Sequence, residues 1–162
     1  MRGHHLLCLL GYRGEGYSPQ FTENMTRIYE TLRNAPSTRI RLVEGEDDIC
    51  SAFPREVESH CCEQSVHRRD DAVLRRLQFK PGDCLSWNDI LKKTAAHVRA
   101  HDIRAWCSTC PWRPLGYCEA GVSRTGEGGS LPPLEDTAGK QTHAKPAAVR
   151  FGHCAGRQRS RR

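Results

Sequence analysis

Apolar residues recur at the period of an α-helix in the stretch that follows Ser18 and Pro19. The positions of this pattern are Phe21, Met25, Ile28 and Leu32. A serine before a proline is typical of a helix start, because the serine hydroxyl caps the first amides and proline is tolerated at the first helical position. The pattern therefore predicts an amphipathic helix over residues 19–33, which ends before Pro36.

The same period returns later in the chain and predicts further helices. One covers residues 63–78, and another begins after Ser86 and extends to Val98. A shorter helix through residue 106 is expected to have Asp102 as its cap. Alternating polar and apolar residues at 39–43 instead predict one short strand. The expected fold is mostly α with a short β strand or hairpin, an α+β domain.

The two ends of the chain have different compositions. The apolar run at residues 6–10 is too short for periodicity to separate a strand from a helix. From Ser123 onward apolar residues are few, and the stretch predicts a disordered basic tail over residues 123–162. This tail holds eight basic and three acidic residues, whereas the predicted domain, residues 1–122, holds 17 and 16. We expect a solvated tail rather than a nucleic-acid-binding one, although its arginines could attract phosphates.

The composition predicts a small core supplemented by cysteine chemistry. Hydrophobic residues make up 37% of the 162 residues and charged residues 27%, and the chain contains nine cysteines. We find no export signal and no run of about 20 apolar residues, so we expect a cytoplasmic protein that does not associate with membranes. Thiols stay reduced in the cytoplasm, and an odd number cannot all pair. The cysteines are therefore expected to staple the domain through a metal.

Two segments of the chain share one arrangement of cysteines. Each has a large apolar residue, then Cys-Ser, a proline four positions after the first cysteine, and another cysteine eleven positions after it. They cover residues 49–61 and 106–118. The second segment contains the pair Cys107-x-x-Cys110, whereas Phe53 stands at the second cysteine position of the first. This repetition predicts a thiolate site with two lobes.

A site assembled on the second segment has three thiols and needs a fourth ligand. The tight Cys-x-x-Cys turn lets Cys107 and Cys110 converge on one ion, and Cys118 can return to the same point. The candidates for the fourth position are Cys8, Cys50 and Cys61. Thiolates suit both zinc and iron–sulfur clusters, and the uneven spacing with flanking aromatic residues leans towards a cluster. A structural zinc protein and an enzyme with a reactive thiol at Cys107 or Cys110 are the alternatives.

The opening of the chain, from Arg2-Gly3-His4-His5 to Gly16-Tyr17-Ser18-Pro19, resembles domain-of-unknown-function family 1284. These are small uncharacterised prokaryotic proteins for which iron–sulfur binding has been suggested. The segments that lead to Cys50 and Cys118 match as well, so the resemblance covers residues 2–122. It implies a cluster, expected to be of the 4Fe–4S type with zinc as the alternative, and no established reaction, substrate or partner. The implied ligands are Cys8, Cys50, Cys61, Cys107, Cys110 and Cys118.

Such a cluster would serve electron transfer, redox sensing or structure. Phe53 departs from the family, whose members usually have a cysteine there, and this departure favours a single shared site. The cysteines left outside the ligand set are Cys62, Cys84 and Cys154.

His4 and His5 stand beside the implied ligand Cys8. They could bind a metal or transfer protons, but we expect at least one to hydrogen-bond to the backbone while the other is exposed. The acidic pairs Asp47-Asp48 and Asp70-Asp71 are expected on a solvated surface, because adjacent residues of a helix do not face each other.

Overall fold

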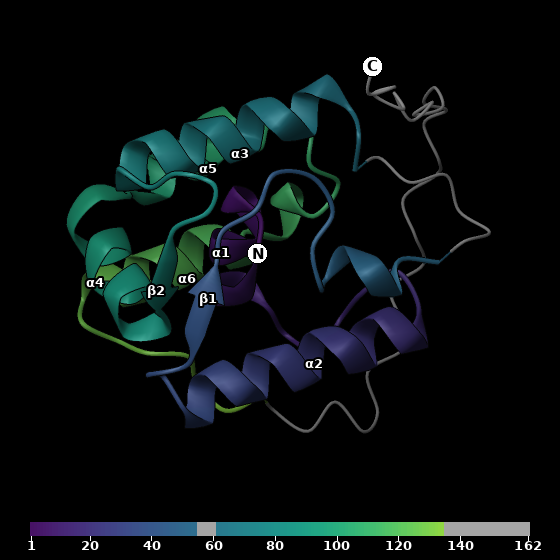
Figure 1. The fold of residues 1–162 in the computed structure, drawn as a ribbon, viewed down its shortest axis with the longest axis horizontal. Helices are drawn as coiled ribbons and strands as arrows, with labels where there is room; N and C mark the ends of the chain where they lie inside the picture. Colours follow the sequence, from purple (N-terminus) through teal and green to yellow (C-terminus); the bar gives the residue numbers. More distant parts are fainter. Residues whose placement is uncertain (55–60, 135–162) are drawn as a thin grey trace, which may run out of the picture.

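A short apolar helix lies at the centre of the molecule. Figure 1 shows the computed structural model, which describes residues 1–54 and 61–134. Helix α1 (Gly3–Gly11) is central and packs against α3 (Gln64–Leu77) and α6 (Tyr117–Gly126). Its four leucines, at positions 6, 7, 9 and 10, are each at most 2% exposed. A helix that is apolar all round requires partners all round, and the neighbouring helices supply them.

Helix α2 (Pro19–Asn34) confirms the first predicted helix and its start. The Ser18 hydroxyl accepts a hydrogen bond from the backbone N–H of Phe21 at 3.1 Å, and proline occupies the first helical position. Its buried residues are Phe21, Met25, Tyr29 and Leu32. Tyr29 takes the buried place that the pattern assigned to Ile28, which is only partly buried.

The later helices are also confirmed, as α3, α4 (Trp87–His97) and α5 (Ala100–Trp106). Ser86 caps α4 by accepting from the backbone N–H of Asp89 at 3.2 Å. Asp102 differs from its predicted role, because it lies within α5 rather than before it. Its carboxylate accepts from the backbone N–H of Arg99 at 2.9 Å, so it stabilises the start of the helix from inside the first turn.

Two short strands complete the α+β fold. β1 (Arg39–Arg41) pairs antiparallel with β2 (Cys84–Ser86), and Ile40 stands opposite Leu85. The predicted strand is thus present but shorter, and its partner comes from the segment before α4. The fold class predicted from the sequence is confirmed.

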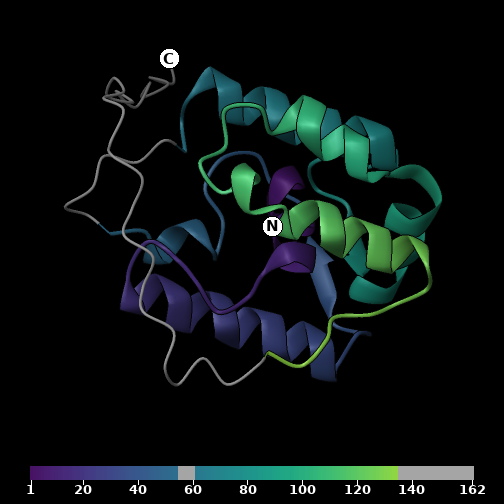
Figure 2. The same ribbon diagram turned by 180° about the vertical axis from the view of Figure 1, so that it is seen from behind.

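Residues beyond the predicted domain boundary still pack on the fold. Helix α6, seen at the front of the molecule in Figure 2, continues to Gly126. Leu131 is 3% exposed, and the hydroxyl of Tyr29 donates to the carbonyl of Pro132 at 2.7 Å. Residues 123–134, which the prediction places in the tail, thus include side chains and backbone that pack on the fold. The rest of that prediction, from residue 135, lies outside the described residues.

The apolar helices are core elements of modest length. Within residues 1–54 and 61–134, no helix combines the length and the hydropathy needed to cross a bilayer.

Candidate metal centre

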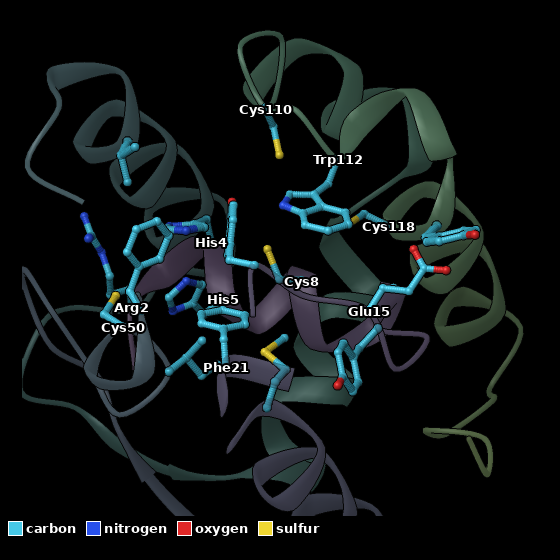
Figure 3. Close-up of a pocket in the computed structure, with 18 of the residues that line it drawn as sticks. Arg2, His4, His5, Cys8, Glu15, Phe21, Cys50, Cys110, Trp112 and Cys118 are labelled. Atoms are coloured by element: carbon cyan, nitrogen blue, oxygen red, sulfur yellow. The ribbon is translucent and has the colours of Figure 1, made fainter. Parts of the chain in front are cut away.

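A cavity of about 130 Å³ opens beside α1 and brings together cysteines from distant parts of the chain. Figure 3 shows several of its lining residues. The predicted ligands that line it are Cys8, Cys50, Cys61, Cys110 and Cys118. The sixth, Cys107, is absent from the lining but packs against the core as a partly buried residue.

Four of these thiols form one group, called here the four-cysteine group: Cys8, Cys107, Cys110 and Cys118. Cys8 comes from α1, Cys107 ends α5, and Cys118 lies in the first turn of α6. The backbone N–H of Cys110 donates to the carbonyl of Cys107 at 2.9 Å, which closes the turn that the Cys-x-x-Cys spacing predicts. Cys8, Cys110 and Cys118 therefore line the cavity, and Cys107 stands next to it at the other end of this turn.

The thiols of this group affect one another's ionisation. A hydrogen bond with Cys118, then burial, then the nearby sulfurs of Cys118, Cys110 and Cys107 raise the pKa of Cys8. The same hydrogen bond lowers the pKa of Cys118, so Cys118 is the first thiol of this pair to lose its proton. Burial raises the pKa of Cys107 to about 12, although the charge of Arg69 opposes the rise.

Two glycines allow the helices that carry Cys8 and Cys118 to touch. A Cβ at Gly11 would lie 2.7 Å from the Cα of Cys118, and a Cβ at Gly121 would collide with the carbonyl of Leu10. Only residues without a side chain permit such an approach of two backbones. The contact of α1 with α6 thus depends on both glycines, and it sets the position of Cys8 against Cys118.

The other two thiols form a second group on the far side of the histidines. The sulfurs of Cys50 and Cys61 are 3.7 Å apart, and Figure 3 shows Cys50 across His4 and His5 from Cys8. Cys50 begins the 3-10 turn η1 (Cys50–Ala52), which follows Asp47. The hydrogen bond with Cys61, together with burial, raises the pKa of Cys50.

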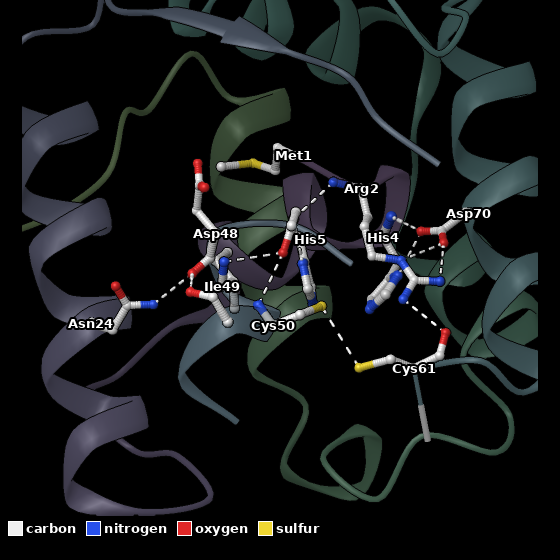
Figure 4. Close-up of polar contacts among 12 residues, drawn as sticks. Met1, Arg2, His4, His5, Asn24, Asp48, Ile49, Cys50, Cys61 and Asp70 are labelled. Atoms are coloured by element: carbon white, nitrogen blue, oxygen red, sulfur yellow. Dashed lines mark hydrogen bonds and ion pairs between the residues drawn. The ribbon is translucent and has the colours of Figure 1, made fainter. Parts of the chain in front are cut away.

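Figure 4 shows the polar contacts around His5, Cys50 and Cys61. The carboxylate of Asp47 connects this second group to α1. It accepts from the backbone N–H of Cys50 at 3.1 Å and from that of Arg2 at 2.8 Å, and it lies 2.8 Å from Nδ1 of His5. Burial alone would raise the pKa of Asp47, but the hydrogen bonds from His5, Arg2 and Cys50 hold it well below its usual value. A ring nitrogen of His5, a carboxylate oxygen of Asp47 and the sulfur of Cys50 lie within 4.8 Å of one another.

A buried ion pair stands behind the second group. Arg2 is 0% exposed, and its guanidinium donates to Asp70 at 2.8 Å and to the carbonyl of Cys61 at 2.9 Å. Nδ1 of His4 lies 2.6 Å from the same carboxylate. Burial and the nearby His5 lower the pKa of His4 to about 3, against the opposing effect of Asp70. His4 is therefore neutral at pH 7, its Nδ1–H donating to Asp70.

The histidines and acidic pairs differ from their expected environments. His4 is buried and His5 half-buried, and both pair with a carboxylate, not with the backbone. In each acidic pair the first residue is drawn into the fold, because Asp47 and Asp70 accept hydrogen bonds from α1. The position of Asp47, three residues before Cys50, is typical of an Asp that caps a turn, but no local signal marks Asp70.

Aromatic rings close the cavity on another side. The ring centroid of Tyr17 lies 4.8 Å from that of Phe53 and 5.4 Å from that of Trp112. Phe53 occupies the position in the first cysteine segment where the second segment has Cys110. It thus belongs to this aromatic wall. Among the cysteines outside the predicted ligand set, Cys62 is exposed and Cys84 lies in β2, and neither lines the cavity. Cys154 lies outside the described residues.

Comparison with known families gives one match. The family model described as "Protein of unknown function (DUF1284)" matches residues 16–116, more than half of the chain. Comparisons with curated proteins and with solved structures found no match.

Proposed function

The chain belongs to the DUF1284 family of proteins of unknown function, and from the geometry of its cavity we propose that it binds an iron–sulfur cluster through Cys8, Cys107, Cys110 and Cys118. One observation supports the proposal: Cys8 of α1, Cys110 of the turn after α5 and Cys118 of α6 line one cavity, and Cys107 closes that turn beside them and acts with Cys110 and Cys118 on the ionisation of Cys8. Four thiolates are the ligand set of 4Fe–4S clusters. When bound, a cluster of this kind accepts and returns single electrons.

The surroundings of the four-cysteine group suit a buried, negatively charged cluster. Arg69 is 6% exposed, and within the described part of the chain its Nε has no hydrogen-bond partner. Its positive charge lowers the pKa of both Cys107 and Cys118. The aromatic wall of Tyr17, Phe53 and Trp112 lines the same cavity, and exposure to solvent is one of the factors that set a cluster's potential.

The alternative of a reactive-thiol enzyme has less support. A nucleophilic cysteine needs a depressed pKa, because the thiolate is the reactive species. Burial instead raises the pKa of Cys107 to about 12. The low-pKa thiol of the group is Cys118, and the hydrogen bond from Cys8 that lowers its pKa also makes it less available as a nucleophile.

Anaerobic purification, followed by a visible spectrum and by iron, sulfide and zinc analysis on one sample, tests the proposal. We expect a brown protein with iron and sulfide in equal amounts. Cys110→Ser should lose both, whereas Cys84→Ser, which alters a cysteine in β2 away from the cavity, should keep both. A colourless protein whose zinc depends on Cys110 would overturn the proposal in favour of structural zinc. A titration of the brown protein then measures the reduction potential that an electron-transfer or sensing role requires.

A further inference from the structure

We propose that the cavity contains a second and separate metal site, in which the thiolates of Cys50 and Cys61 bind a single divalent ion, with zinc the best fit. The third ligand is His5, which has a ring nitrogen within 4.8 Å of the Cys50 sulfur. This site goes beyond the proposed cluster, because it uses two cysteines that the cluster does not need and a histidine. It separates the six implied cysteine ligands into two centres.

The distance between the two sulfurs suits one shared ion. Two thiolates at about 2.3 Å from a tetrahedral zinc ion stand about 3.8 Å apart, and the sulfurs of Cys50 and Cys61 are 3.7 Å apart. A disulfide would bring the two sulfurs to about 2.05 Å. In a 4Fe–4S cluster each cysteine binds a different iron atom, so two ligands of one cluster stand further apart than two ligands of one ion. The pair is thus spaced as ligands of a mononuclear site.

Asp47 orients this site rather than binding its ion. One oxygen of its carboxylate accepts from the backbone N–H groups of Ile49 and Cys50, at 3.0 and 3.1 Å. The other accepts from the N–H of Arg2 and lies against Nδ1 of His5, both at 2.8 Å. These four contacts occupy the lone pairs of the carboxylate. A carboxylate on one ring nitrogen of a metal-binding histidine is a common arrangement, and it fixes the tautomer so that the other nitrogen, here Nε2, is the ligand.

The charge near Cys50 and Cys61 is locally balanced. Arg2, which donates to the carbonyl of Cys61, forms an ion pair with Asp70 at 2.7 Å. Two thiolates carry two negative charges, which match the charge of a divalent ion.

Three protein ligands leave a fourth position that faces the cavity. Structural zinc sites have four protein ligands, whereas catalytic sites keep one position for water or substrate. His4 and Arg2 line the same cavity as Cys50, Cys61 and His5. A ligand with an anionic oxygen or sulfur donor, small enough for the cavity, is the chemical class that this position would accept.

The test measures zinc separately from iron and sulfide in the full-length protein, with four variants beside the wild type. Cys50→Ser and His5→Gln should lose about one zinc per chain while they keep iron and sulfide. Cys62→Ser is the matched control, since Cys62 is the exposed neighbour of Cys61, and it should keep the zinc. Cys110→Ser should show the reverse pattern, with iron and sulfide lost and zinc retained.

A further variant, at Asp47, tests the site without removing a ligand of the ion. Asp47→Asn should weaken the binding of zinc by about 10–100-fold, the usual effect of losing a carboxylate partner of a metal-bound histidine. Zinc affinity is measured by competition with a chromophoric chelator, and cobalt substituted for zinc should show thiolate charge-transfer absorption that Cys50→Ser abolishes.

The outcomes separate this inference from the proposed function. Loss of iron and sulfide together with zinc in Cys50→Ser would overturn the second site, because the pair would then belong to the cluster. Wild-type protein that binds no zinc, even when zinc is added, would also overturn it. A protein without iron whose zinc requires Cys50 and His5, but not Cys110, would support the second site and reject the cluster.

Discussion

At the scale of single residues, two aspartates that are adjacent in the sequence can differ in how deeply they are buried. Asp47 and Asp70 are drawn into the fold by hydrogen bonds with α1, whereas the neighbouring Asp71 is exposed. A buried carboxylate is tolerated only when charged or hydrogen-bonding partners replace the water that it loses. Arg2 and His4 provide those partners for Asp70. Such partners therefore decide which aspartate of each pair enters the fold.

We predict that Asp70→Asn strongly destabilises the protein. The substitution leaves the guanidinium of Arg2, which is 0% exposed, without its counter-charge. Breaking a buried ion pair from one side costs on the order of 3 kcal/mol. Urea denaturation measures the free energy of unfolding, and Asp71→Asn at the exposed neighbouring position is the control, expected within about 0.5 kcal/mol of wild type. Equal stability of the two variants would contradict the role given to this ion pair.

At the scale of elements, the fold depends on how closely α1 approaches α6. Gly11 and Gly121 lie on the two facing surfaces, and each leaves room for the backbone of the other helix. The approach places Cys8 of α1 beside Cys118, whose position at the start of α6 also favours a thiolate through the helix dipole. The close contact between α1 and α6 therefore also determines how Cys8 and Cys118 are placed relative to each other.

Gly121→Ala should accordingly weaken both folding and metal binding. The new methyl group would collide with the carbonyl of Leu10, and overpacking of this kind costs about 1–3 kcal/mol. The separation of the helices should also reduce the iron and sulfide content of purified protein. Gly126→Ala in the same helix is the matched control, since its Cβ would meet nothing within 4 Å. If Gly121→Ala kept the stability and metal content of Gly126→Ala, the close contact would not matter.

At the scale of the whole molecule, the described chain closes on itself beyond α6. Arg124 donates to the carbonyl of Leu10 at 2.8 Å, and Leu131 is buried in the same core cluster as the leucines of α1. The hydroxyl of Tyr29 holds Pro132 against α2. Residues 123–134 therefore belong to the domain, although their composition predicts a tail.

Truncation after residue 134 should preserve stability, whereas truncation after residue 122 should not. The shorter chain loses the buried side chain of Leu131, worth about 2 kcal/mol, and the contacts of Arg124 and Pro132 in addition. Thermal unfolding of both truncations and of the full chain measures the difference. A chain of residues 1–122 as stable as the full protein would restore the boundary that composition indicates.

The sequence by itself determined the elements whose signals are local. Helical periodicity and the caps at Ser18 and Ser86 were enough to predict α2, α3 and α4, because these signals act within a turn or two of the chain. The Cys-x-x-Cys spacing also predicted the turn that joins Cys107 to Cys110, because that signal is local. Five of the six cysteines that the family resemblance implied line the cavity.

Only the tertiary structure decided the rest. The run at residues 6–10 became a helix because three-dimensional packing surrounds it, and periodicity cannot show that. The burial of Asp47 and Asp70 depends on contacts between segments more than 40 residues apart, and the pairing of Cys8 with Cys118 depends on the packing of α1 against α6. The distances between these sulfurs and the loss of water around these carboxylates arise from packing between distant segments. The local sequence pattern does not contain this information.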